Sequence, residues 1–292
     1  MHGILVLNKS SGPTSARCLT ALKRMGQKKI GHAGTLDPLA SGVLLVLLGQ
    51  ATKLSSHLMA GGRKVYSGVL RLGQTTDTWD CQGRILEETP WSGVSVEDVR
   101  REIALWREAR EQPVPPYSAA KHNGQPLYRL ARKGCDLPQK VKRTEISQAD
   151  TLDVSLPFVR FRVACSSGTY IRSLAHSLGM RLGCGAVLTE LTREYSHPFG
   201  LDVSCALRDI EAEPLLLTRH VRPLADALPE WSRIDLTSDE AERVRNGLPV
   251  FRVRTEPAGE RKALLQHRGE PLALAGREEE SSCWTVVRGL WS

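Results

Sequence analysis

Hydrophobic residues along the chain follow two periods, and each period predicts a different kind of element. Short apolar or alternating runs predict strands in the segments 3–9, 43–48, 64–73, 157–168 and 185–200. In the segment 157–168 the apolar residues Val159, Phe161, Val163 and Cys165 are separated by polar or small residues, among them two arginines. This alternation predicts a half-buried strand.

A helical period predicts helices in the segments 14–26, 95–106, 169–183 and 237–247. Thr14 or Ser15 is the expected cap of the first helix. The residues expected near its buried face are Ala16, Leu19, Ala21 and Leu22.

The other helices carry signals at their ends. Ser95 and Asp98 form a variant of the capping box at the start of the second helix. Gly183 is expected to end the third helix, while Ser238 is expected to cap the fourth and Gly247 to end it.

Strands and helices do not alternate strictly, which favours an α+β fold with a mainly antiparallel mixed sheet. The segment 222–233 is interrupted by prolines, and the residues after it contain short strand patterns and one helix. We therefore expect a large domain at 1–228 and a small β-rich domain at 229–292.

Composition narrows the class of protein. The chain has 292 residues, of which 41% are hydrophobic and 25% charged, as in ordinary globular proteins. No apolar run approaches the ~20 residues of a membrane span, and no signal peptide is recognisable, so we expect a cytoplasmic protein. The seven cysteines include no Cys-x-x-Cys pair, and the histidines form no His-Glu-x-x-His motif. These patterns argue against a disulfide framework and a metal site.

Charge is unevenly distributed. The net charge is +8, yet residues 233–292 hold ten basic and ten acidic residues. The segment 121–143 holds seven Lys or Arg residues against one Asp. A basic segment of this kind fits either a polyanion partner or a solvated surface loop.

One carboxylate lies in an unusual loop, "IGHAGTLDPLASGVLLVLLGQATKL". The loop has neither the order of a phosphate-binding loop nor a Gly-x-Gly-x-x-Gly motif, and His32 with Asp37 is a poor metal cluster. Asp37 is therefore either a turn residue before Pro38 or a nucleophile or base.

Several segments, in order, resemble the motifs of the bacterial TruB family of RNA pseudouridine synthases. They are the Asp37 loop and the segments "VLNKSSGPTS", "KVYSGVLRLGQTTDTWDCQG", "QPVPPYSAAKHNGQPLYRLARKG", "CSSGTYIRSLAHSLG" and "CGAVLTELTR". Ser10 departs from the family, which usually has proline there. The resemblance implies a pseudouridine synthase core with an RNA-gripping thumb at about 113–145, followed by a small PUA-like RNA-binding domain.

The resemblance also implies the chemistry, an isomerisation that needs no cofactor and no metal. The catalytic set would be Asp37, Tyr66 and Arg172. Asp37 would act as nucleophile or base, and Tyr66 would lie against the target base and take its C5 proton. Arg172 would pair with Asp37, which is expected to be buried and to need a cation for that reason.

The substrate implied is uridine 55 in the T-loop of tRNA, which would be flipped out of its stack. His32 would fill the space vacated by the base, Tyr170 would hydrogen-bond and Leu191 would form an apolar wall. Lys9 and Lys64 would fix a loop or lie near phosphate. Phosphate contacts from the basic segment would come from Arg129, Arg132 and Lys133.

Two other functions remain open from the sequence. One is a guide-RNA-dependent subunit that needs partner proteins, although a motif starting at residue 3 favours a stand-alone bacterial enzyme. We expect a monomer with no obligatory protein partner. The other is an RNA chaperone that refolds tRNA, either as the sole role or beside catalysis.

Overall fold

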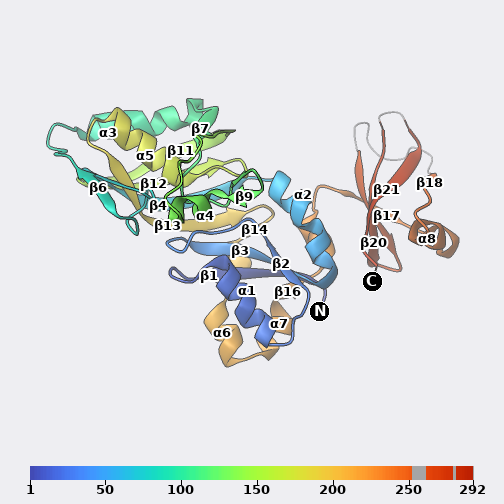
Figure 1. Cartoon of the computed structure of the whole chain (residues 1–292). Helices are drawn as coiled ribbons and strands as arrows, with labels where there is room; N and C mark the ends of the chain where they lie inside the picture. Colours follow the sequence, from blue (N-terminus) through green and yellow to red (C-terminus); the bar gives the residue numbers. More distant parts are fainter. Residues whose placement is uncertain (252–260, 279–280, 292) are drawn as a thin grey trace.

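The computed structural model describes residues 1–251, 261–278 and 281–291, arranged around two separate sheets (Figure 1). Residues 252–260, 279–280 and 292 of the predicted C-terminal domain lie outside the described residues. Within the part described, no helix is long and apolar enough to cross a membrane.

A ten-stranded sheet forms the larger part of the molecule. Its main path runs β11 (Ile146–Ser155), β12 (Phe158–Cys165), β4 (Lys64–Leu72), β13 (Ala186–Ser196), β3 (Ser41–Leu48), β1 (Gly3–Lys9) and β15 (Cys205–Ala206). The strands β2 (Ile30–Ala33), β14 (Phe199–Gly200) and β16 (Val221–Arg222) pair beside this path. Only the pairs β13–β3 and β1–β15 of this sheet are parallel among the described residues, so the prediction of a mainly antiparallel α+β core is confirmed.

Strand β3 reads as a continuous apolar run because both of its faces are buried. Val43 and Leu45 face a cluster that includes Leu264 of the C-terminal part, whereas Leu44 and Val46 face the cluster under the helices. The helices that contribute to this second cluster are α1 (Ser15–Arg24), α3 (Val96–Ala104), α5 (Ile171–Arg181), α6 (Leu207–Ala212) and α7 (Leu215–His220). The helical elements η1 (Gly49–Leu54) and α2 (Ser55–Ala60) cover the other face.

The first helix differs from its prediction. Thr14 is the cap, and its side chain accepts from the Arg17 amide. The buried residues of α1 are Ser15, Cys18 and Leu22, while Ala16 is exposed. The predicted face was wrong at Ala16 because Ser15 turns inward, where its hydroxyl has backbone partners.

The capping of the other helices was partly predicted. Ser95 and Asp98 form a complete capping box on α3. On α8 (Ser238–Arg245) the cap is Thr237, with Glu240 completing the box, so the prediction of Ser238 was wrong by one residue. Threonine is the cap because only a cap at that position has a glutamate three residues later.

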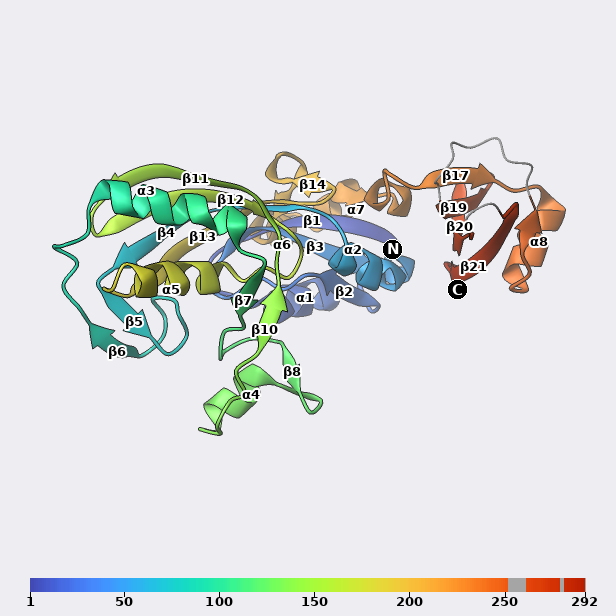
Figure 2. The ribbon, with the colours of Figure 1, turned by 90° about the horizontal axis from the view of Figure 1, so that it is seen from above.

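The predicted thumb projects from the larger part of the molecule (Figure 2). Its stem consists of β7 (Glu111–Pro113) paired with β10 (Val141–Arg143). Its tip contains β8 (Lys121–His122), β9 (Gln125–Pro126) and α4 (Leu127–Arg132). A second hairpin, β5 (Gln74–Thr76) with β6 (Ile85–Glu88), lies at the far end of the sheet.

The C-terminal part is a five-stranded sheet, which confirms the predicted β-rich domain. Its order is β17 (Ser232–Asp235), β19 (Lys262–His267), β20 (Glu270–Gly276), β21 (Cys283–Gly289) and β18 (Val250–Phe251), with α8 beside it. Leu264 and Leu274 share a core cluster with Ile4, and Lys53 Nζ donates to the Trp291 carbonyl at 2.8 Å. These contacts dock the domain against the large sheet.

Candidate active site

The Asp37 loop (residues 34–40) connects β2 with β3 and is fixed by its own backbone. Ser15 Oγ accepts from the Leu36 amide at 3.0 Å and donates to the Leu36 carbonyl at 3.1 Å, so one buried hydroxyl holds both polar groups. The Asp37 carbonyl accepts from the Ala40 amide at 3.1 Å. The residue that carries the carboxylate is therefore held from both sides.

Arg193 on β13 fixes the start of the same loop. Its side chain is completely buried and donates to the carbonyls of Gly34 at 3.1 Å and Thr35 at 3.4 Å. The Pro38 carbonyl accepts from the Gly12 amide at 2.8 Å. All five carbonyls from residue 34 to residue 38 thus have a donor within the chain, which makes the loop a rigid platform.

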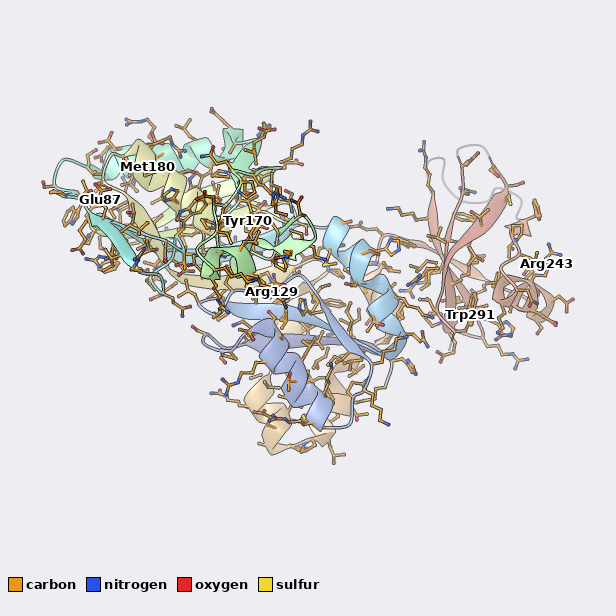
Figure 3. The ribbon with its side chains drawn as sticks, in the orientation of Figure 1. Glu87, Arg129, Tyr170, Met180, Arg243 and Trp291 are labelled. Carbon is orange, nitrogen blue, oxygen red and sulfur yellow. The ribbon has the colours of Figure 1, made fainter. Side chains whose placement is uncertain are left out.

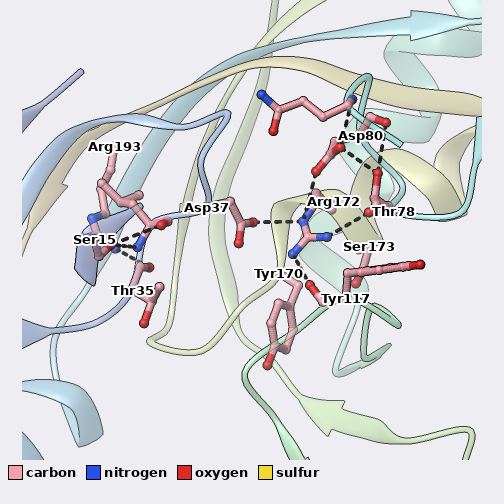
Figure 4. Close-up of polar contacts among 12 residues, drawn as sticks. Ser15, Thr35, Asp37, Thr78, Asp80, Tyr117, Tyr170, Arg172, Ser173 and Arg193 are labelled. Carbon is pink, nitrogen blue, oxygen red and sulfur yellow. Dashed lines mark hydrogen bonds and ion pairs between the residues drawn. The ribbon is translucent and has the colours of Figure 1, made fainter. Parts of the chain in front are cut away.

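Arg172, the second residue of α5, joins three separate segments (Figure 4). Its Nε donates to Asp37 Oδ2 at 2.9 Å, its Nη1 to the Thr78 carbonyl at 2.8 Å and its Nη2 to the Tyr117 carbonyl at 3.0 Å. The planar guanidinium suits this task because its donors point in fixed directions. The Asp37 loop, the turn after β5 and the base of the thumb therefore meet at one side chain.

The buried carboxylate of the site is Asp80, a residue with no predicted role. Its side chain is 8% exposed and lies 3.8 Å from Arg172 Nε, whereas the Asp37 side chain is 39% exposed. Asp80 Oδ1 accepts from Thr78 Oγ1 at 2.7 Å and from the Gln82 amide at 3.1 Å. The expectation that Asp37 is buried was wrong, because its side chain is only half-buried, whereas the Arg172 cation is 5% exposed.

An acid in the segment "TTDTWDCQG" was the signal that could have pointed to Asp80. Pattern alone could not select it, because Asp77 occupies the same segment and is bonded instead to the Arg84 amide at 2.8 Å. The choice depends on which acid the turn directs toward α5.

Two tyrosines and a leucine line the neighbourhood of this ion pair. Tyr66 lies on β4 and is almost fully buried; burial raises the pKa of its hydroxyl, and the positive charge of Arg193 opposes that rise. Tyr170 is the residue before α5, and burial also raises the pKa of its hydroxyl. Leu191 on β13 pairs with Gly68 of β4 and belongs to the core.

The remaining predicted site residues are His32, Lys9 and Lys64. Burial lowers the pKa of His32, and Arg193 lowers it further; among the described residues its Nδ1 has no hydrogen-bond partner. Burial lowers the pKa of Lys9, which is fully enclosed. Burial and the charge of Arg193 lower the pKa of Lys64 to about 8.

The basic residues of the thumb are not gathered with this cluster. Arg129, Arg132 and Lys133 are exposed on α4 and its C-terminal cap, and no ion pair of theirs occurs among residues 1–251, 261–278 and 281–291. Figure 3 shows Arg129 on the thumb and Tyr170 at the start of α5, where the thumb stem leaves the core. The Gln112 side chain of that stem accepts from the Tyr170 amide at 3.0 Å.

No group of three or more His, Cys, Asp or Glu residues that could hold a metal occurs in the described part of the chain. The arrangement instead offers one solvent-facing carboxylate on a rigid loop, beside a buried cation and two tyrosines. Such an arrangement can deliver an anionic oxygen to a reacting carbon or proton.

Comparison with known proteins decides the family. The sequence profile described as "TruB family pseudouridylate synthase (N terminal domain)" matches residues 23–171, just over half of the chain. The chain belongs to the TruB family. It is therefore an enzyme, an isomerase of the pseudouridine synthase class.

Relatives match the chain over its full length. The tRNA pseudouridine synthase B of Oleidesulfovibrio alaskensis is 60% identical over 100% of this chain and 97% of its own. The protein of the same name from Nitratidesulfovibrio vulgaris Hildenborough is 56% identical over 100% and 98%. That of Geobacter sulfurreducens is 38% identical over 100% and 96%.

Solved structures agree on the fold of this TruB family member. A Cbf5–Nop10–Gar1 complex contains a chain with a TM-score of 0.70 and 21% identity, covering 99% of this chain and 85% of that one. An H/ACA RNP bound to a substrate RNA containing 2′-deoxyuridine gives a TM-score of 0.69 at 21% identity, covering 100% and 86%. At these identities the likeness shows the fold alone.

Proposed function

We propose that this enzyme converts uridine 55 in the T-loop of tRNA to pseudouridine, with Asp37 as its catalytic carboxylate. The observation that carries the proposal is the geometry of Asp37, which is open to solvent yet held by Arg172 at 2.9 Å on a loop whose carbonyls from residue 34 to residue 38 all have donors. The names of the 60% and 56% identical relatives support tRNA as the substrate.

The reaction breaks the bond between C1′ and N1 of uridine and forms a bond between C1′ and C5. N1 gains a proton and C5 loses one, so the product is an isomer of the substrate. Asp37 acts in one of two ways. It is either a nucleophile that attacks the uracil or the sugar, or a general base that removes a proton from the sugar. Both roles require a carboxylate that reaches a nucleotide from outside the fold, which the exposure of Asp37 provides.

The residues near Asp37 suit a flipped base. Tyr66 contacts the base and receives the C5 proton, while Leu191 forms an apolar wall behind it. Tyr170 provides a hydrogen-bonding hydroxyl at the site. His32, whose Nδ1 has no partner among the described residues, enters the T-loop in place of the flipped base. Arg172 is a positioning residue, because it acts through Asp37.

Away from these residues, Arg129, Arg132 and Lys133 contact the RNA backbone from the thumb. The small domain, with its boundary near residue 229, acts as a PUA-like RNA-binding domain. These contacts contribute affinity without reading sequence.

The proposal is tested with Asp37→Asn. Asparagine keeps the shape of the side chain but removes its negative charge, so isomerisation should fall by more than about 10³-fold. Binding of tRNA should stay within a few fold. Tritium release from a transcript labelled at C5 of uridine measures the rate, and turnover within tenfold of the parent enzyme would refute the assignment.

The same assay separates the alternatives. A purified stand-alone enzyme modifies a bare tRNA transcript at position 55, whereas a guide-RNA-dependent subunit does not. A tRNA-folding role beside catalysis would leave the Asp37→Asn protein able to refold a misfolded transcript. If that variant binds tRNA but no longer refolds it, the hypothesis of a tRNA-folding role is refuted.

A further inference from the structure

Lys9 and Lys64 are both buried, but among the described residues only Lys9 has acceptors for its ammonium group. Lys9 is 0% exposed, and its Nζ donates to the carbonyls of Ser10 at 2.9 Å and Pro38 at 3.4 Å. Lys64 is 8% exposed, yet across residues 1–251, 261–278 and 281–291 its Nζ has no hydrogen-bond acceptor and no carboxylate within 4.0 Å. A largely buried ammonium that has no acceptor from the protein is unfavourable, so its placement needs an explanation.

The side chains around Lys64 make that placement more unfavourable. Arg193 on β13 and Lys142 on β10 are both close enough to lower the pKa of Lys64. Cys165 on β12 also faces it, but burial raises the pKa of that thiol to about 11, so the thiol is neutral and balances no charge. Asp37, the nearby acid, is bonded to Arg172.

These cations lie beside the residues proposed to hold the nucleotide. Lys64 is two residues before Tyr66 on β4, so both side chains project from the same face of the strand. A methyl group on Gly34, in the Asp37 loop, would come within 3.0 Å of Lys64 Nζ. Lys142 lies over the ring of Tyr170, 6.0 Å from its centre. Lys64 therefore lies beside the Asp37 loop, and Lys142 lies beside Tyr170.

We propose that Lys64 and Lys142 form an anion site that binds a backbone phosphodiester beside the flipped uridine, whereas Lys9 only fixes the Asp37 loop. The phosphodiester would supply the acceptor that Lys64 lacks. This inference rests on the proposed function, because it places an RNA nucleotide at Asp37. A charge-assisted bond to phosphate is roughly twice as strong as a neutral hydrogen bond.

A double-mutant cycle tests the contact. A T-arm hairpin is made with a neutral methylphosphonate at either linkage flanking the target uridine, and binding is measured to the parent and to Lys64→Met. We expect a methylphosphonate at one of the two linkages to weaken binding to the parent by about tenfold or more. The same methylphosphonate should weaken binding to Lys64→Met far less. Equal losses in both proteins at both linkages would overturn the proposal. The cycle is repeated with Lys142→Met.

Stability of the free enzyme provides an independent readout with Lys9 as the matched control. Lys64→Met removes an ammonium without acceptors and should raise the melting temperature by at least about 2 °C. Lys9→Met removes an ammonium group that has acceptors and should lower the melting temperature. The pKa of Lys64 is depressed to about 8 in the folded protein, against 10.5 in the unfolded chain. The free-energy cost of burying its charge is therefore complete below pH 8 and disappears as the pH rises toward 10.5. The gain of Lys64→Met should shrink accordingly above pH 8, and a gain that stays constant would contradict the buried charge.

The pH dependence of RNA binding gives the third readout. In the parent, affinity for the hairpin should fall above about pH 8, as Lys64 loses its proton. Lys64→Arg keeps its charge at all these pH values and should bind with a flatter profile. The same decline in Lys64→Arg as in the parent would count against the site.

Failure of this inference is distinguishable from failure of the proposed function. If the parent isomerises the unmodified hairpin but the methylphosphonate cycle shows no coupling, the anion site is wrong and the function stands. If the parent binds but does not isomerise position 55, the proposed function is wrong whatever the cycle shows.

Discussion

In the Asp37 loop each carbonyl from residue 34 to residue 38 accepts a hydrogen bond, whereas in the thumb the helix α4 buries a single side chain, Leu127. Both segments belong to the same proposed RNA site. The loop is held by Ser15 and Arg193, which come from elements far apart in the sequence. The thumb is attached through the three-residue strands of its stem.

This difference corresponds to two physical tasks. A reacting carboxylate must be held within about 0.5 Å of its productive position, because small displacements cost large factors in rate. Phosphate contacts depend on charge at several ångströms and tolerate movement. Variants of the loop should therefore change the rate, and variants of the thumb should change the affinity.

The largest effect after Asp37→Asn is expected for Arg172→Met. The change leaves Asp80, which is 8% exposed, without its cation, and a broken buried pair typically costs about 3–5 kcal/mol of folding free energy. It also frees Asp37, so the single-turnover rate should fall steeply. Thermal melts and single-turnover assays measure the two effects.

A double variant separates them. Arg172→Met with Asp80→Asn removes the unbalanced charge and should recover much of the stability, but the rate should stay low because Asp37 is still unheld. Recovery of the rate together with stability would show that Arg172 has only a structural role.

A smaller effect is expected for Ser15→Ala. The change removes both hydrogen bonds to the Leu36 backbone, so the turnover number should fall by about 10- to 100-fold, with the dissociation constant for tRNA nearly unchanged. Thr20→Ala on the same helix is the matched control, since that hydroxyl bonds only to the Ala16 carbonyl at the surface. Equal rates in the two variants would mean that the loop does not need this support.

The smallest effect on the rate at saturating tRNA is expected for Arg129, Arg132 and Lys133 changed together to Gln. These exposed cations do no chemistry, so the dissociation constant should rise and the log–log salt slope should flatten by about 0.7–0.9 for each phosphate that the thumb no longer neutralises. In the control, Arg208 and Arg219, which are exposed on α6 and α7, are changed to Gln. A salt slope that does not change in the folded thumb variant would make the basic segment a solvated surface.

Local patterns predicted the elements whose signals are contained in neighbouring residues. The alternation of Val159, Phe161 and Val163 gave a correct buried face on β12, because a strand exposes alternate residues to opposite sides. The box of Ser95 and Asp98 was correct because both partners lie within one helical turn. The predicted buried face of α1 did not include Ser15, because its partner, Leu36, lies 21 residues away.

The sequence by itself determined that the chain has an α+β core, a small β-rich domain and the motifs of the TruB family, since periodicity, turns and motif order are local properties. Only the tertiary structure decided that the buried acid is Asp80 and the open one Asp37, and that Lys9 has acceptors while Lys64 has none among the described residues. The physical reason is that burial and hydrogen-bond partners depend on which distant segments meet. Arg172 contacts residues 55, 94 and 135 positions away along the chain, and no pattern within one segment contains that information.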